Sequence, residues 1–476
     1  MKKGLWILLV MIFFGQIAFA YNKEYHKPSD AKVLKKIEQW QDYKFGLMMH
    51  WGPYSQYGIV ESWSLCNEEW INRNVGPYEN YGDYFKWYEG LKTTFNPKDF
   101  DPQKWADAAE RAGMKYVVFT TKHHDGFCMF DTKTTDYKIT DKDCAFSSNP
   151  KANITKEIFS EFQKKNFMIG AYFSKPDWHT EYYWWPYYAH ATRHVNYDPA
   201  KHPERWQNFK DYTYNQIEEL MTNYGKIDIL WLDGAWVRPN NNIPEEFEEW
   251  ARYRTYNQDV DIPRIAKMAR EHQPGLMVVD RWVAGEYENY LTPENKVPDE
   301  ALLVPWEACI TMTGGWAFNK GQRYKTVHQL INIMVNIVAK NGNFLLNIAP
   351  SPEGDWVPDA YDRLEGIGQW MDINSEAIYG TKPITPYDEN NIRFTQKSKV
   401  LYAIYLPDED ETEMPKFVNI NSFAPNKNTK VELLGNNGKL EWEKNGKGII
   451  ISVPESLTQN PPCENAWVFK IENIIE

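Results

Sequence analysis

Short apolar runs alternate with amphipathic stretches along the first 380 residues of the chain. The apolar runs fit strands of a parallel sheet that is covered on both faces. They are 45–49, 116–120, 168–173, 227–234, 276–280, 302–309 and 343–348. The stretches with helical periodicity are 31–42, 102–112, 154–166, 203–224, 262–272, 325–340 and 358–378. This α/β alternation predicts a (β/α) TIM-like barrel, in which the loops after the strands carry the chemistry.

The predicted barrel departs from the regular form, because seven strands are found in the sequence where about eight are usual. We therefore expect an irregular barrel. A doubly wound open sheet is the alternative fold. No glycine-rich phosphate loop follows any of the predicted strands, and this disfavours the open sheet.

The pattern changes after Gly380, where short alternating or β-branched runs replace the helices. These runs are 400–406, 416–420, 430–434, 448–453 and 466–471. Turn residues separate them, as in the stretch 435–438. The pattern predicts a C-terminal antiparallel β-sandwich at 381–476, after a catalytic barrel domain at 21–380. We expect the sandwich to support the barrel rather than to bind a ligand.

Residues 1–20 have the three parts of a secretory signal peptide. Lys2 and Lys3 give a basic start, 5–14 an apolar core, and Ala18 to Ala20 a small-residue cleavage site. We expect cleavage after Ala20 and a secreted or periplasmic protein. No cysteine follows the cleavage site, and no later stretch is long and apolar enough to span a bilayer. We therefore expect no membrane anchor.

Composition narrows the classes of partner. The net charge of −12 counts against nucleic acid and anionic membrane surfaces. The five cysteines are scattered without a CxxC pair, so neither a zinc site nor a disulfide framework is indicated. Aromatic residues make up 16% of the chain, and Trp and Tyr suit pyranose rings. The aromatic run 182–188 fits either an aglycone subsite or a subunit contact in a homo-oligomer.

Polar and aromatic side chains gather where the predicted strands end. In a barrel these ends converge on one pocket. Trp231 and Asp233 fall on the same side of their strand, because strand side chains alternate with period two. The strand-end residues are His50, His123, His124, Trp231, Asp233, Arg281 and Glu307.

Two uses of this pocket compete, a metal site and a carbohydrate site. Histidine is the commonest metal ligand. The adjacent His123 and His124 would point to opposite faces if their strand continued through them, and no HxH or HExxH spacing is present. Both observations count against a metal site. A carbohydrate site is favoured. Arg281 and Glu61 would then bond sugar hydroxyls, while Trp63 and Trp231 would pack on the ring.

Glycoside cleavage needs two carboxyl groups, one beside C1 and one at the leaving oxygen. Asp233 is the candidate nucleophile, because Arg281 and the imidazoles favour its ionised form. A loop acid that loses water when substrate binds would have the raised pKa that proton donation needs. Spacing does not choose this acid among Glu286, Glu288, Glu294, Glu300 and Glu307.

Seven motifs occur together and in order over residues 40–380. They are HWGPYS (50–55), TKHHDGF (121–127), WLDG (231–234), DRW (280–282), TPE (292–294), PWEACIT (305–311) and NFLLNIAPSPEGDW (343–356). The chain resembles the family 29 α-L-fucosidases in all of them. The resemblance implies a retaining exo-glycosidase with a barrel that departs from eight regular strands and a C-terminal β-sandwich. It implies no metal or cofactor.

The resemblance also implies roles for single positions. Asp233 matches the family's nucleophile and Glu294 its acid/base. The positions that match fucose contacts are His50, His123, His124, Tyr172, Trp231 and Arg281. Trp63 matches an aromatic that flanks the site, and Trp316 a position where an aromatic packs near the fucose methyl. Glu61 is placed with the sugar contacts, although Ser62 separates it from Trp63 where the family often has Glu and Trp adjacent.

The expected function is that of a retaining exo-α-L-fucosidase acting on fucosylated oligosaccharides or glycoconjugates. Two alternatives stay open. One is an exo-glycosidase for galactose, which shares the axial 4-hydroxyl but carries a 6-hydroxyl where fucose has a methyl. An apolar wall near Trp316 favours fucose. The other is a catalytically dead carbohydrate-binding protein, which the presence of both candidate acids disfavours. The sequence does not indicate the linkage preference.

Overall fold

The computed structural model describes residues 25–190, 192–241, 256–411 and 413–474. The expected signal peptide at 1–20 lies outside the described residues. Within the described part of the chain, no helix has both the length and the apolar character needed to cross a bilayer.

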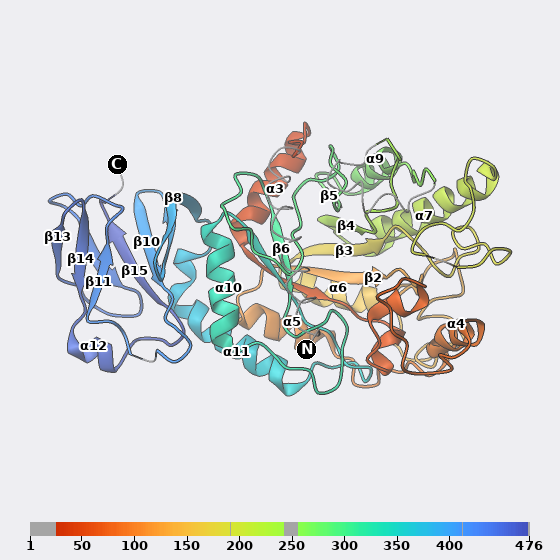
Figure 1. Cartoon of the computed structure of the whole chain (residues 1–476), viewed down its shortest axis with the longest axis horizontal. Helices are drawn as coiled ribbons and strands as arrows, with labels where there is room; N and C mark the ends of the chain where they lie inside the picture. The colour runs from red at the N-terminus through yellow and green to blue at the C-terminus, as the bar shows by residue number, and fades with distance from the viewer. Residues whose placement is uncertain (1–24, 191, 242–255, 412, 475–476) are drawn as a thin grey trace, which may run out of the picture.

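Seven parallel strands form one curled sheet, in the order β5-β4-β3-β2-β1-β7-β6 (Figure 1). Each predicted barrel strand is present, with ends that differ by a few residues. Nearly every residue of these strands is buried, as expected for a sheet covered on both faces. The strands are β1 (Phe45–Met49), β2 (Tyr116–Lys122), β3 (Met168–Ser174), β4 (Ile229–Asp233), β5 (Met277–Asp280), β6 (Glu307–Thr311) and β7 (Asn343–Asn347).

Helices follow most of the strands and pack on the outer face of the sheet (Figure 1). Local sequence fixes their starts. Asp101 caps α5 by accepting from the Gln103 amide, and Thr326 and Gln329 form a capping box on α10. The α-helices are α3 (Ala31–Tyr43), α4 (Tyr81–Gly90), α5 (Pro102–Arg111), α6 (Ile154–Lys164), α7 (Pro203–Asn223), α9 (Ile262–His272), α10 (Val327–Ala339) and α11 (Pro358–Asn374). Short 3₁₀ helices are η1 (Pro53–Gln56), η2 (Glu61–Leu65), η3 (Leu91–Thr93) and η5 (Ser375–Ala377).

An irregular segment, 287–295, bridges the two edge strands of the sheet. Its first part pairs antiparallel with β5, through the bridge between Val279 and Glu288. Its second part runs parallel to β6, through bridges from Leu291 to Trp306 and from Glu294 to Cys309. We call 287–295 the closing segment. It takes the place of an eighth strand, which explains why the sequence pattern contains seven.

The interior of the barrel has its own apolar core, separate from the layer between sheet and helices. Alternate residues of each strand contribute to the two layers. Val118 points into the barrel, whereas Val117 and Phe119 pack toward the helices. Trp40 and Tyr290 stack at 4.0 Å within the inner core. The interior is therefore filled, except where the strand ends open into the site.

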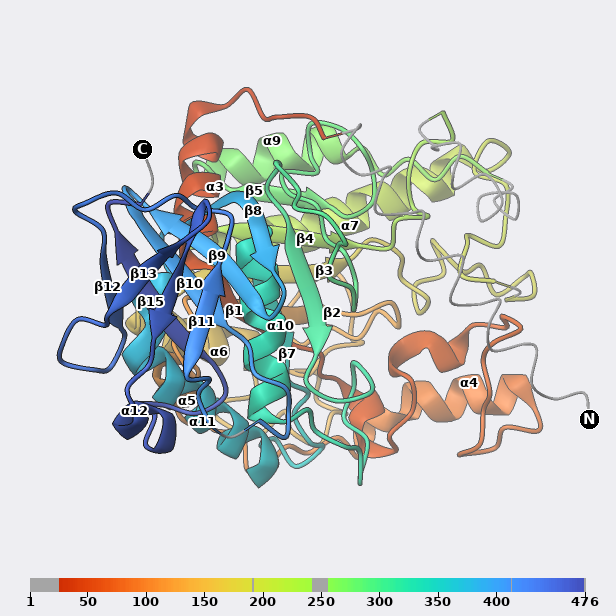
Figure 2. The ribbon, with the colours of Figure 1, turned by 60° about the vertical axis from the view of Figure 1, so that its left-hand side comes forward.

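Residues after 380 form two antiparallel sheets that enclose a second core (Figure 2). This is the predicted sandwich. The five-stranded sheet contains β12 (Lys430–Leu433), β15 (Trp467–Glu472), β10 (Val400–Tyr405), β9 (Ile392–Lys397) and β8 (Lys382–Glu389). The three-stranded sheet contains β11 (Phe417–Ile420), β14 (Gly448–Ser452) and β13 (Trp442–Asn445), and a short helix, α12, spans Glu455–Gln459.

The sandwich packs against α10 and α11 on the outside of the barrel (Figure 1). Trp370 on α11 donates its indole N–H to the Ala466 carbonyl at 3.0 Å. Arg393 on β9 donates to Asn336 Oδ1 on α10 at 2.6 Å. The contact involves helices that lie outside the sheet, so the sandwich faces the barrel's flank and not the pocket described next.

Candidate active site

One pocket at the carboxyl ends of the strands contains every residue predicted for the site except Glu307. These residues are His50, Glu61, Trp63, His123, His124, Tyr172, Trp231, Asp233, Arg281, Glu294 and Trp316. The sequence did not single out the other residues of the lining, which are Met48, Arg193, Ala235, Trp236, Trp282 and Cys309. The structure thus brings the predicted set together, while the role of each residue stays a prediction.

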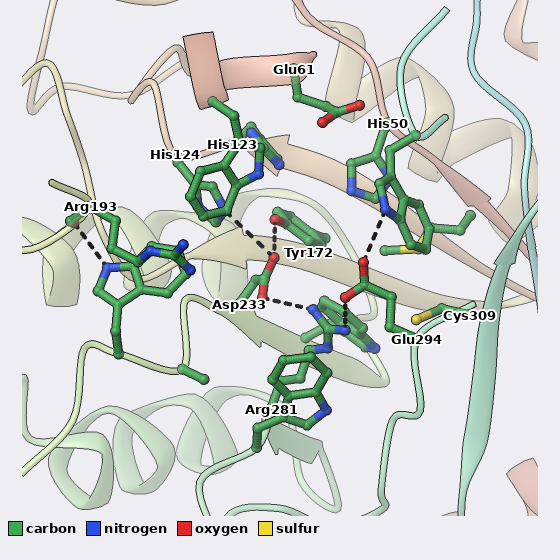
Figure 3. A pocket seen from close by; sticks show the side chains of 17 residues that line it. His50, Glu61, His123, His124, Tyr172, Arg193, Asp233, Arg281, Glu294 and Cys309 are labelled. Carbon is green, nitrogen blue, oxygen red and sulfur yellow. Dashed lines mark hydrogen bonds and ion pairs between the residues drawn. The ribbon is translucent and has the colours of Figure 1, made fainter. Parts of the chain in front are cut away.

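Asp233 is the last residue of β4 and lies near the centre of the pocket (Figure 3). Gly234 has a φ of +88°, which lets the chain turn directly after the aspartate. Tyr172 donates to Oδ2 at 2.7 Å, and Arg281 Nη1 donates to Oδ1 at 3.1 Å. Burial alone would raise the pKa of Asp233, but Arg281, His124 and the Tyr172 hydrogen bond outweigh it and hold that pKa well below its usual range. Asp233 is therefore ionised.

One guanidinium joins the two candidate catalytic carboxylates. Arg281 contacts Asp233 through Nη1 and Glu294 Oε2 through Nη2 (Figure 3). Trp316 donates its indole N–H to Glu294 Oε1 at 3.1 Å. The Glu294 side chain is 33% exposed, whereas that of Asp233 is 15% exposed. Glu294 thus stands nearer to solvent, and it is carried by the closing segment.

The other glutamates that the sequence left open do not line the pocket. Glu286 and Glu300 are exposed, and Glu300 accepts a hydrogen bond from Tyr387 of the sandwich at 2.7 Å. Glu288 is buried and accepts from the Trp282 amide at 2.9 Å. Glu307, predicted as a strand-end residue of the pocket, opens β6 and lies below the pocket floor. Among the five glutamates, Glu294 is the one that lines the pocket.

The two adjacent histidines both line the pocket, with ring centroids 4.2 Å apart. Their expected opposite orientation depended on β2 continuing through them. The strand ends at Lys122, so the alternation does not apply to His123 and His124. His123 Nδ1 contacts Ser62 Oγ at 2.5 Å, and His50 Nδ1 contacts Asn347 Oδ1 at 2.9 Å.

The imidazoles of the pocket are neutral. Burial lowers the pKa of His50 to about 4 and that of His124 to about 3, and it lowers the pKa of His123 well below its usual range. A neutral imidazole has one donor and one acceptor nitrogen, which suits sugar hydroxyls. Across the described residues, no group of three or more His, Cys, Asp or Glu side chains is arranged to hold a metal ion.

Residues 61–65 form η2, a 3₁₀ helix at the rim of the pocket. Glu61 accepts from the Ala317 amide at 2.8 Å, and burial raises the pKa of Glu61 to about 7. Ser62, which separates Glu61 from Trp63, bonds His123 instead of facing away. Trp63 packs edge-on to His124 at 5.2 Å. The inserted serine therefore leaves both Glu61 and Trp63 in the lining.

Glu307 supports the pocket from below. Its carboxyl accepts from Tyr116 OH at 2.7 Å and from the Trp231 indole N–H at 3.2 Å. Burial raises the pKa of Glu307 from 4.5 to about 7. The buried group is thus mostly protonated in mildly acidic solution, and it orients Trp231 against the floor of the site.

Glu307→Gln is expected to reduce the loss of stability that the protein shows as pH rises. Because the folded pKa of Glu307 is raised, its contribution to stability is fully present below pH 4.5 and is lost as pH rises through about 7. The loss is on the order of 3 kcal/mol by pH 8, and glutamine cannot ionise. Urea unfolding midpoints at pH 5 and pH 8 would measure it. Parallel pH curves for the wild type and the variant would contradict the expectation, and Glu286→Gln, at an exposed position, serves as the control.

Six residues of the lining were missed by sequence reasoning, among them Arg193, Trp236 and Trp282. Trp236 and Trp282 come shortly after Asp233 and Arg281, so extending the strand-end rule by a few residues would have found them. Arg193 follows the aromatic run 182–188, and nothing else in the sequence near it indicates that it reaches the pocket. Arg193 lies over Trp63, with Cζ 4.7 Å from the ring centroid.

Comparison with known proteins finds matches in both domains of the chain. The family model "Alpha-L-fucosidase" matches residues 13–376, and "Alpha-L-fucosidase C-terminal domain" matches 387–472. The chain is 29% identical to human tissue α-L-fucosidase, over 98% of this chain and 97% of the relative. It is 28% identical to the rat tissue enzyme, over 99% and 97%.

Solved structures give the same result. α-L-Fucosidase isoenzyme 1 from Paenibacillus thiaminolyticus superposes with a TM-score of 0.72 at 27% identity, covering 94% of this chain and 100% of that one. The Thermotoga maritima α-fucosidase superposes with a TM-score of 0.68 at 25% identity, with the same coverage. The chain therefore belongs to the α-L-fucosidases of glycoside hydrolase family 29.

Proposed function

We propose that this α-L-fucosidase works by double displacement with net retention, with Asp233 as the nucleophile and Glu294 as the acid/base. The contact of both carboxylates with the one guanidinium of Arg281 is the observation that supports this assignment. Retaining glycosidases hold their two carboxyl groups about 5–5.5 Å apart. Contact with neighbouring nitrogens of one side chain is compatible with such a pair.

In the first step Asp233 attacks C1 of the fucoside, while Glu294 protonates the departing oxygen. Asp233 is suited to attack because it is ionised and is held by Tyr172 and Arg281. Glu294 needs a proton at this stage. Its side chain is one-third exposed, so it can reach the departing oxygen of a bound substrate and donate a proton to it.

In the second step Glu294 takes a proton from the water that attacks C1. The ester that then joins Asp233 to fucose carries no negative charge. Of the two carboxylates that Arg281 contacts, Glu294 is then the one that is still available as an anion. The contact with Arg281 then holds the Glu294 carboxyl in place while it acts as the general base. A single arginine thus assists both steps.

The remaining pocket residues would hold the sugar. The neutral imidazoles of His50, His123 and His124 offer donors and acceptors to hydroxyls. Trp316 packs beside His50 at 5.0 Å and offers an apolar surface for the fucose methyl. The family assignment favours fucose over galactose, and an active enzyme over a protein that only binds sugar.

Four further expectations from the sequence remain proposals. The substrates would be fucosylated oligosaccharides or glycoconjugates, and the T. maritima relative has been solved in complex with fucose. The protein would be secreted or periplasmic, and sequencing of the exported protein would then begin at Tyr21. Residues 21–380 would form the catalytic domain and 381–476 its support. A homo-oligomer that uses the run 182–188 stays a hypothesis, with Tyr187 79% exposed.

The stereochemistry of the product tests the mechanism. Proton NMR during hydrolysis of an aryl α-L-fucoside should show α-L-fucose first and β-L-fucose later, as the free sugar mutarotates. The two displacements each invert C1, so their sum retains its configuration. If β-L-fucose formed first, the mechanism would be inverting and Asp233 would not be a nucleophile.

A further inference from the structure

An exposed tryptophan continues the aromatic lining of the pocket toward solvent. Trp70 is 54% exposed, and its ring centroid lies 5.3 Å from that of Trp63 with the planes inclined by 55°. Trp63 lines the pocket, whereas Trp70 lies just beyond the lining. Aromatic side chains therefore extend from the lining of the pocket to the exposed Trp70.

Trp70 is held in one orientation although it is exposed. Its indole N–H donates to Glu68 Oε2 at 3.1 Å. The same carboxylate accepts from Arg193 Nε at 2.6 Å and from the Arg193 amide at 3.2 Å, and it also contacts Nη2. Arg193 in turn covers Trp63. Because its polar edge is bonded to Glu68, what Trp70 offers to solvent is chiefly its apolar ring face.

The backbone that carries Trp70 is also fixed. Arg73 Nε donates to the Ser64 carbonyl at 2.5 Å, and Arg73 Nη2 donates to Asn67 Oδ1 at 2.8 Å. Asn67 Nδ2 donates to the His190 carbonyl at 2.6 Å, which ties this loop to the segment that bears Arg193. A surface that is ordered before binding loses little conformational freedom when a ligand arrives.

We propose that Trp70, together with Glu68 and Arg193, forms a subsite for a sugar ring of the fucosylated glycan beyond the fucose itself. This inference rests on fucose occupying the pocket, as in the proposed function. A pyranose has an apolar C–H face that fits an indole ring, and its hydroxyls would meet the charged pair beside that ring. The occupant is part of the same substrate, because the aromatic surface is continuous with the pocket.

Trp70 lies outside the group of residues proposed for the chemistry at C1. Trp70 has no described contact with Asp233, Glu294 or Arg281, so its replacement should leave the chemistry at C1 intact. The effect of losing Trp70 should therefore depend on what is attached to the fucose.

The test compares substrates with and without further sugars. Trp70→Ala should hydrolyse α-L-fucosyl fluoride, whose leaving group is a single atom, within about twofold of the wild type. On a fucosylated disaccharide or a branched trisaccharide, kcat/KM should fall about tenfold, the loss expected when some 50 Å² of apolar contact disappears. Inhibition by free fucose should stay unchanged, and Trp70→Phe should recover most of the activity because it retains a ring.

Two outcomes would overturn the subsite. An equal fall on the fluoride and on the oligosaccharides would mean that Trp70 acts through the pocket, by way of Trp63. Unchanged activity on both oligosaccharides would mean that no sugar contacts it. Phe417→Ala, at a 61% exposed position in the sandwich, is the matched control and should behave as wild type on all substrates. The substrate ratio does not depend on product stereochemistry, so the subsite and the retaining mechanism can fail separately.

Discussion

Asp233→Ala should lower kcat/KM on aryl α-L-fucosides by at least about 10⁴-fold, while fucose still binds. The variant has no group to form the covalent intermediate. Loss of a nucleophile on which both displacement steps depend has effects of this size. The sugar contacts of His50 and His123 do not pass through Asp233, so the dissociation constant of fucose should change far less. Initial rates and fucose titration by calorimetry measure the two quantities.

A small external nucleophile provides the decisive control for Asp233→Ala. Azide can occupy the space left by the carboxylate and attack C1 from the same face. Rates on an activated fucoside should then rise, and the product should be β-L-fucosyl azide, with inverted configuration. Activity like that of the wild type without azide would refute the assignment of Asp233.

Glu294→Ala should reduce hydrolysis in proportion to the difficulty of the leaving group. Proton donation contributes roughly 10²–10⁴-fold, and it matters most for a poorly stabilised alkoxide. Natural sugar aglycones should therefore lose about that factor, whereas α-L-fucosyl fluoride should lose much less in the first step. Steady-state kinetics on a series of leaving groups of known pKa would show a steeper dependence in the variant than in the wild type.

Azide also distinguishes the two carboxylates. In Glu294→Ala the fucosyl-Asp233 ester still forms, so azide should attack that ester and give α-L-fucosyl azide, with retained configuration. Equal losses on all leaving groups would instead point to Glu61, which is the third carboxyl group of the pocket lining. Glu286→Ala is the matched control, because Glu286 lies in the same connection but is exposed.

The sequence predicted the parallel strands well, because burial on both faces leaves unbroken apolar runs. The run at 343–348 corresponds to β7 at Asn343–Asn347, for example. The closing segment was not recognisable as a sheet element, because its pairing consists of isolated bridges. In the sandwich, three strands lie outside the predicted runs: β8 (Lys382–Glu389), β9 (Ile392–Lys397) and β13 (Trp442–Asn445). Of these, β8 contains two prolines and lies at an edge, where burial imposes little pattern.

The pocket could be predicted where chemistry and strand position coincide, as at Asp233 and Arg281. It could not be predicted where a long loop supplies the residue. Arg193 reaches the pocket through its bonds to Glu68, some 125 positions away in the chain, and no periodicity marks such a pair. The orientation of His123 and His124 also depended on where β2 ends, a boundary that an apolar run leaves uncertain by a residue or two.

The two carboxylates proposed for catalysis are anchored very differently. Asp233 ends β4, an interior strand of the seven-stranded sheet that has β3 on one side and β5 on the other. A shift in the register of β4 would therefore displace both neighbouring strands. Glu294 belongs to a seam with sparse pairing, where insertions or deletions are tolerated more easily. Evolution, or an engineer, can therefore relocate the proton donor and retune leaving-group preference while the nucleophile stays in place.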